Sequence, residues 1–85
     1  MDKKVYVASR RLRIADEWIR CNTLFLQEYL GLTEKPRLIS LDDCDLTRLH
    51  GLTDCLIILV DLPAVAVRTA RLMHPRHTFL DCCLD

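Results

Sequence analysis

One aspartate of this chain, Asp61, stands where chemistry could occur. It follows six consecutive apolar residues, 55–60, and an unbroken apolar run of this length is typical of a strand buried on both faces of a parallel sheet. Pro63 then indicates the start of a helix. Asp61 would lie at the carboxyl end of that strand, the edge where ligands bind in open α/β sheets. It could accept a phosphoryl group, but we expect its carboxylate to cap the next helix.

A basic cluster near the amino terminus could also bind a ligand. Arg10, Arg11 and Arg13 fall at the expected start of a helix, where backbone amides favour anions, and Arg20 lies further along it. No aromatic residue interleaves with the cluster and the formal net charge of the chain is zero, which disfavours nucleic acid. We expect this cluster to contact an acidic partner. Phosphate or nucleic-acid binding is the alternative.

The five cysteines raise the question of a metal or redox site. Cys82 and Cys83 are adjacent on an expected strand, so their side chains point to opposite faces and are badly placed to share an ion. His74 and His77 could join a thiolate around zinc, but no Cys-x-x-Cys pair accompanies them. We expect no metal, no cofactor, and reduced thiols that are buried or lie at a sheet edge.

Signatures of catalysis are missing from the sequence. With two glycines in the chain, a glycine-rich loop around a phosphate is nearly excluded, and no Ser-His-Asp spacing occurs. A sugar-phosphotransferase carrier has a similar order of strands and helices, but it needs a cysteine nucleophile straight after strand one. Ser9 stands there instead. We therefore expect neither an enzyme nor a small-molecule substrate.

Length and composition favour one small domain, residues 1–85, in the cytoplasm. The chain is 51% hydrophobic, with no signal-peptide pattern and no apolar stretch near the roughly 20 residues that span a bilayer. Eight basic and five acidic residues give residues 1–40 a charge of +3, while four basic and seven acidic residues give 41–85 a charge of −3. A short chain with so many apolar residues cannot easily cover its own apolar surface, and this favours a homodimer or a complex with a partner.

The apolar patterns predict alternating strands and helices. Right-handed crossovers would make this order a four-stranded parallel sheet with strand order 2-1-3-4 and helices on both faces, an α/β fold. The expected strands are 4–8, 37–41, 55–60 and 78–84; the expected helices are one long helix from Ser9 to Gly31, a short one capped by Asp42 and Asp43 through His50, and a third from Pro63 to His74.

Two sets of residues are expected to be buried. In the third helix, Val65, Ala66, Thr69, Leu72 and Met73 can face the sheet. The most buried residues of the chain should include Trp18, Phe25, Ile57, Ile58 and Leu72.

Nearly the whole chain resembles the first two-thirds of a response-regulator receiver domain. The resemblance rests on the strand Val5–Ala8, on Ser40-Leu41-Asp42-Asp43, on the segment from Asp54 to Pro63, and on Met73-His74-Pro75. It is closest to the degenerate receivers at the front of LuxR-type transcription regulators. A receiver is flavodoxin-like, and Asp61 matches its phospho-acceptor position.

The sequence departs from a working receiver at three places. Ser9 and Arg10 replace the acidic pair that would hold Mg²⁺, and Pro63 comes two residues too soon for the usual loop. The chain also ends before the fifth strand, which would bring a lysine. The resemblance therefore implies a pseudo-receiver, a non-enzymatic module for transcription regulation that acts by protein–protein contact. A phosphoryl-accepting switch that uses Asp61 remains the alternative.

We expect the partner surface on helix one and strand four. A receiver has a second helix beside helix one, so without it the broad face of helix one and the inner residues of strands three and four would stay exposed. Asp81 marks strand four as an edge strand, and the partner would be a second copy or another regulator. Its expected contacts are Trp18, Phe25, Tyr29, Phe79 and Asp81, with Arg10, Arg11 and Arg13 at the rim.

Overall fold

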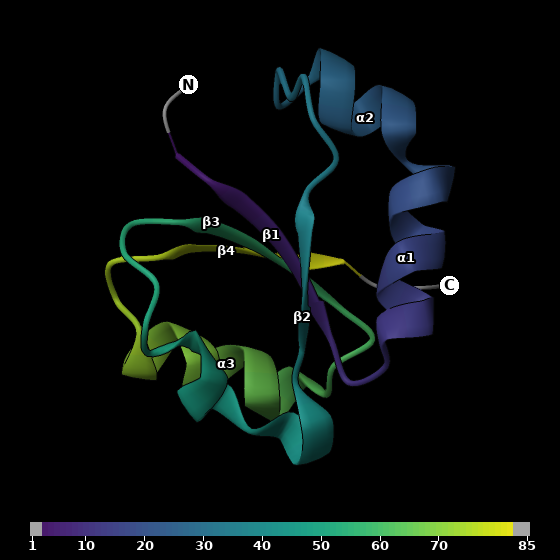
Figure 1. Ribbon diagram of the computed structural model, residues 1–85. Coiled ribbons are helices and arrows are strands. Elements are labelled where there is room, and N and C mark those ends of the chain that lie inside the picture. The colour runs from purple at the N-terminus through teal and green to yellow at the C-terminus, as the bar shows by residue number, and fades with distance from the viewer. Residues whose placement is uncertain (1–2, 83–85) are drawn as a thin grey trace.

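The structure, a computed structural model, describes residues 3–82 (Figure 1). Its strands are β1 (Val5–Ser9), β2 (Arg37–Ser40), β3 (Leu56–Val60) and β4 (Thr78–Cys82); its helices are α1 (Leu12–Cys21), α2 (Thr23–Glu28) and α3 (Ala64–Met73), with two 3₁₀ turns, η1 (Asp42–Cys44) and η2 (Leu46–Leu49). Cys83 and Leu84, expected in strand four, lie outside the described residues.

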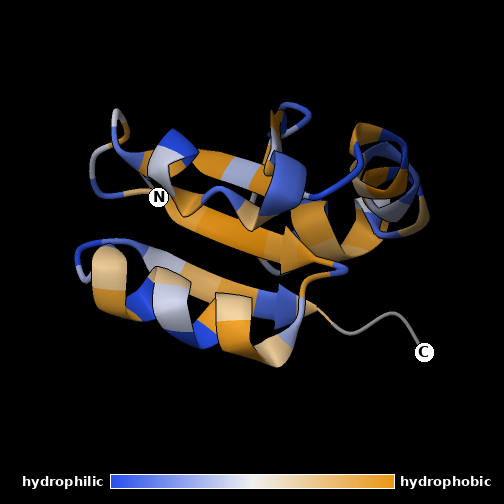
Figure 2. Ribbon diagram, turned by 90° about the horizontal axis from the view of Figure 1, so that it is seen from below, coloured by the Kyte–Doolittle hydropathy of each residue, from blue (hydrophilic) through white to orange (hydrophobic). Residues whose placement is uncertain are grey.

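The four strands form one parallel sheet in the order β2-β1-β3-β4. Every residue of β1 and β3 is buried, as expected for the two central strands of a parallel sheet. Figure 2 shows the apolar character of β3 along its whole length. The predicted flavodoxin-like α/β fold with strand order 2-1-3-4 is therefore confirmed.

Helices cover both faces of the sheet, as predicted. In Figure 1, α1 and α2 lie on one side, and α3 with the 3₁₀ turns lies on the other. On the α1 side, Val7, Ile58 and Val60 pack with Trp18 and Leu26. On the α3 side, the strand residues pack against the turns and α3; this cluster includes Tyr6, Ile57, Leu59, Leu41, Leu46, Leu49, Val67, Ala70 and Phe79.

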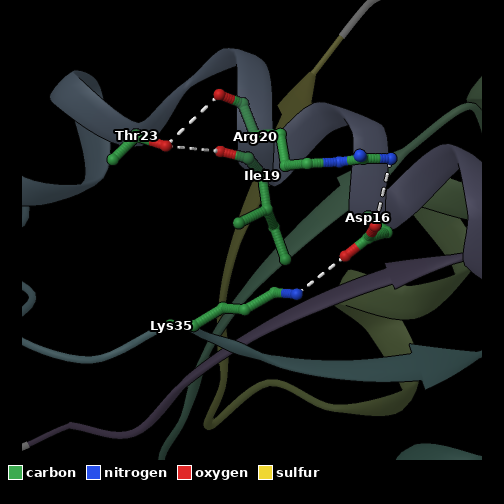
Figure 3. Close-up of polar contacts among 5 residues, drawn as sticks. All are labelled: Asp16, Ile19, Arg20, Thr23 and Lys35. Carbon is green, nitrogen blue, oxygen red and sulfur yellow. Dashed lines mark hydrogen bonds and ion pairs between the residues drawn. The ribbon is translucent and has the colours of Figure 1, made fainter.

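The prediction of one long helix after β1 is wrong, because the helix breaks at Asn22. That residue has φ −120° and ψ 26°, and its side-chain amide donates to the Trp18 carbonyl oxygen at 2.7 Å. The Thr23 hydroxyl donates to the carbonyl oxygens of Ile19 and Arg20, each at 3.2 Å (Figure 3). Side chains thus bond to carbonyls at the end of α1, which competes with helix continuation.

The break turns Leu26, not Phe25, into the core. Leu26 is buried, whereas Phe25 is only half-buried, so the expectation that Phe25 would rank among the most buried residues is wrong. Gly31 does follow the end of α2, with φ +66°, a conformation that glycine adopts without steric cost.

The helix starts differ from the predicted ones by one to three residues. Ser9 ends β1 and does not cap α1; Arg11 holds the cap position, and its amide donates to the Ser9 hydroxyl at 3.3 Å. The short helix is two 3₁₀ turns, and Asp45 caps the second by accepting from the Thr47 amide at 3.2 Å. Asp43 lies inside η1 with φ 54°, so the predicted cap by Asp42 and Asp43 is wrong.

The third helix presents a different face from the one predicted. Ala66, Val67 and Ala70 are buried against the sheet, whereas Leu72 is 83% exposed. The expected burial of Val65, Leu72 and Met73 is therefore wrong, while that of Trp18, Ile57 and Ile58 is confirmed. The two alanines allow α3 to lie close to the sheet. The helix therefore faces the sheet with its small residues, and its longer apolar residues face outward.

Candidate functional site

The carboxyl edge of the sheet brings Arg10 and Asp61 together. Ser9 is the register partner of Val60 in the β1–β3 pair, so the residue after each strand emerges at the same edge. The Arg10 Nη2 atom lies 3.5 Å from Asp61 Oδ1, and Arg10 Nε donates to the Asp61 carbonyl oxygen at 3.1 Å. One guanidinium thus contacts both the carboxylate and the backbone of Asp61.

This pair is partly open to water, with Arg10 and Asp61 side chains 39% and 36% exposed. Ion pairs in such positions contribute little to stability, typically about 0–1 kcal/mol. The pair nevertheless fixes a positive charge at the site, because the Arg10 guanidinium lies beside Asp61, the only carboxylate that directly follows one of the two central strands.

Asp61 does not cap α3, so that prediction is wrong. Pro63 holds the cap position and no side chain accepts from the first amides of the helix. The amides of Ala66 and Val67 bond to the Pro63 carbonyl oxygen instead. Asp61 has φ +57°, a left-handed conformation that aspartate and asparagine tolerate better than most residues.

The residues after β2 complete the edge with opposite charges. The Ser40 hydroxyl donates to Asp42 Oδ1 at 2.8 Å, and Arg48 Nη2 lies 3.6 Å from Asp42 Oδ2. Arg10, Arg11, Asp42, Asp43 and Cys44 line an open hollow here. Because both arginines and aspartates line this hollow, it is not a uniformly positive pocket of the kind that would bind a polyanion.

Arg20, which the sequence places along the basic cluster, is held by a carboxylate. Its Nη2 atom lies 3.3 Å from Asp16 Oδ2, and Lys35 Nζ lies 2.7 Å from Asp16 Oδ1 (Figure 3). The Lys35 hydrogen bond is the main cause that lowers the pKa of Asp16. Arg20 is therefore partly neutralised, whereas Arg11 and Arg13 are exposed and form no ion pair within residues 3–82.

The predicted partner residues divide into exposed and buried ones. Tyr29 is 79% exposed and its ring lies 5.5 Å from that of Phe25, and Asp81 is exposed on the edge strand β4. Trp18 and Phe79 are each only 7% exposed, inside the chain's own core. The expectation that inner residues of β3 would stay exposed is wrong, because α1 and α2 already cover them.

Three histidines form a cluster that the sequence indicated only in part. His74 is buried, and its ring lies 5.0 Å from that of His50 and 5.7 Å from that of His77. His74 Nε2 lies 3.1 Å from the Leu46 carbonyl oxygen. The spacing of His74 and His77 signalled this pair; His50 joins through the fold, because η2 packs beside the end of α3.

Within residues 3–82, no three side chains of the metal-ligating types are placed to hold a metal ion. Cys55 is buried and its thiol donates to the Thr53 carbonyl oxygen at 3.2 Å, while Cys82 is half-buried. Cys83 lies outside the described residues, so the predicted division of this thiol pair between two faces stays a prediction.

No family model matches this chain, and neither does any curated protein or solved structure. In the part of the chain that the structure describes, no helix is long and apolar enough to cross a membrane.

Proposed function

We propose that this chain is a non-enzymatic regulatory module, a pseudo-receiver that acts by contact with a second copy or with another regulator of transcription. The observation that carries the proposal is the contact of Arg10 with both the carboxylate and the carbonyl of Asp61. It supports a receiver-like edge in which a built-in cation replaces the metal-binding acids.

The chemistry of phosphoryl transfer explains why this replacement favours a module without activity. A carboxylate accepts a phosphoryl group only when cations neutralise the charge that builds up on the transferred oxygens, usually with Mg²⁺ held by further carboxylates. Ser9 and Arg10 follow β1 instead. Asp42, the carboxylate that follows β2, is bonded to Ser40 and Arg48.

The surface we propose for the partner runs along α1 and α2 to the edge of β4. It offers Tyr29 and Leu24, which are 79% and 69% exposed, and the half-buried Phe25, whose ring contacts that of Tyr29. Arg11 and Arg13 lie at its basic end, where they would favour an acidic rim on the partner. Asp81 lies on the outer strand, whose free edge could pair with a strand of another chain.

A phosphodonor experiment tests the proposal. The purified chain is incubated with acetyl phosphate and Mg²⁺, and its intact mass is measured; we expect no change. An Arg10→Ala variant is incubated and measured in the same way as a control, because it removes the cation beside Asp61 while leaving Asp61 in place. A phosphorylated species that disappears in Asp61→Asn would overturn the proposal and establish the phosphoryl-accepting switch in its place.

A further inference from the structure

The outward side of α3 carries apolar side chains that the chain itself leaves uncovered. Val65, Leu72 and Met73 are 60%, 83% and 40% exposed. Val65, Arg68 and Leu72 follow one another at spacings of three and four, so they form one line along the helix. We call the residues Val65, Arg68, Arg71, Leu72 and Met73 the α3 outer face. Figure 2 shows apolar and polar bands alternating along this helix.

The segment 62–80, which contains α3, carries only positive charge, and Asp61 and Asp81 border it. From Leu62 to Leu80 the sequence contains three arginines, Arg68, Arg71 and Arg76, and no aspartate or glutamate. All three arginines are exposed, and within residues 3–82 none of them forms an ion pair. Arg10, Arg20 and Arg48, by contrast, each lie against a carboxylate of the chain.

A pocket continues the surface at the carboxyl end of α3. It has a volume of about 360 Å³ and is lined by Met73, Pro75, Arg76 and Leu52, with the rings of His74 and His77 and the segment 53–54 around them. Asp54 is the acidic residue in this lining. A single apolar side chain could enter the pocket beside Met73, next to the helix line of Val65 and Leu72.

Exposed apolar residues are common when they are scattered singly, but here three lie on one ten-residue helix between unpaired arginines. Arginine suits carboxylates because its planar guanidinium can donate two parallel hydrogen bonds to one carboxylate. A membrane-surface helix keeps its apolar face separate from its basic face, whereas in α3 Arg68 lies between Val65 and Leu72 on the same line of the helix. Charge and shape together favour an acidic protein segment.

We infer that the α3 outer face is a docking site for an acidic amphipathic helix of a partner protein. Apolar side chains of that helix, spaced three or four residues apart, would pack on Val65, Leu72 and Met73. Its flanking Asp or Glu side chains would pair with Arg68 and Arg71, and with Arg76 at the pocket. This inference rests on the proposed function as an interaction module, and adds a second surface on the opposite face of the sheet from α1.

The test is a selection from a phage library of random 16-residue peptides on the intact immobilised chain. We expect the enriched peptides to combine Asp or Glu with apolar residues at helical spacing. Their binding should fall about tenfold or more in Arg68→Glu/Arg71→Glu and in Leu72→Ser, and should weaken with added salt. The matched control is Lys4→Glu/Arg37→Glu, which makes the same charge change at two exposed positions at the amino ends of β1 and β2 and should leave binding unchanged.

Each other outcome overturns the inference. The inference is wrong where the selection enriches no peptide, where the enriched peptides lack acidic residues, or where the α3 variants bind the peptides as well as the wild-type chain does. Binding of the wild-type chain, and not of the α3 variants, to phosphatidylserine vesicles or to duplex DNA without peptide enrichment would assign the face to those ligands instead. Because all the changed residues are exposed, the variants should fold like the wild type, and circular dichroism checks this. The phosphodonor result is independent, so a failure here is distinguishable from a failure of the proposed function.

Discussion

The ring of His77 accepts a hydrogen bond from the backbone amide of Cys55, with 3.0 Å between Nδ1 and the amide nitrogen. Cys55 is buried and directly precedes β3. An amide at this depth needs an acceptor. The imidazole ring supplies one only while Nδ1 is unprotonated, so the entry into the central strand depends on the neutral form of a histidine.

Acidification should therefore destabilise the fold. Burial, followed by the nearby His74, lowers the pKa of His77 below its ordinary value of 6.5, although Asp54 and the Leu49 carbonyl oppose the shift. Because the unfolded chain binds the proton more readily, the stability from this group is fully present above pH 6.5. It decreases as the pH falls from there through the lower folded pKa. Urea unfolding between pH 8 and pH 5 should show a decrease of at most about 1.4 kcal/mol per pH unit from this residue.

Substitution of His77 separates its charge from its hydrogen bond. In His77→Asn the side-chain oxygen can still accept from the Cys55 amide but cannot be protonated, so the variant should keep most of the stability and lose this part of the pH dependence. His77→Ala should cost roughly 1–3 kcal/mol at pH 8, because it leaves the buried amide without an acceptor. An unchanged pH profile in His77→Asn would contradict the assignment to His77.

The backbone of Asp61 leads to a second prediction. Since its φ is +57°, Asp61→Asn should change the free energy of unfolding by less than about 1 kcal/mol, because asparagine tolerates this conformation and the ion pair is partly exposed. Asp61→Ala should cost about 1–2 kcal/mol, and Asp61→Gly should recover most of that loss. Equal melting temperatures for the alanine and asparagine variants would show that backbone strain does not govern this position.

The sheet could be predicted from the sequence because its signals are local and strong. The apolar run 55–60 is typical of a buried strand, and the alternation of strands with helices favours a parallel sheet with right-handed crossovers. The break at Asn22 could not be predicted this way. The residues on both sides of it share one apolar stripe, and the hydrogen bonds of Asn22 and Thr23 to α1 carbonyls, which compete with helix continuation, form only in the folded chain.

The candidate site could be predicted in place but not in detail. Asp61 lies at the carboxyl edge as the sequence indicated, yet its contact with Arg10 depends on β1 and β3 being register neighbours. Which face of α3 is buried could not be predicted from the sequence either. Both faces of that helix carry apolar residues, and the close approach allowed by Ala66 and Ala70 decides which of them is buried.

A pair of truncations tests this assignment of faces. Ile58 is fully buried in the α1-side cluster, so Ile58→Ala should cost about 2–5 kcal/mol, enough to threaten folding of so small a domain. Leu72→Ala removes a side chain of the same volume from a position 83% exposed and should change stability by less than about 0.5 kcal/mol. Thermal unfolding followed by circular dichroism measures both. A large loss in Leu72→Ala would show that α3 packs by the other face.

The association predicted from the sequence can now be tested on exposed residues. Phe79→Glu is unsuitable as a probe, because Phe79 is 7% exposed and a buried charge would unfold the chain. Tyr29→Glu places the charge at a position 79% exposed on the α1–α2 surface, and Leu72→Glu places one at a similarly exposed position on the opposite side of the sheet. Where the partner is a second copy of the chain, sedimentation velocity should give twice the mass of a single chain for the wild type. Tyr29→Glu should shift it to monomer, because a charge would be buried in the apolar contact, and Leu72→Glu should remain a dimer. A dimer that Tyr29→Glu leaves intact would place the contact away from α1 and α2.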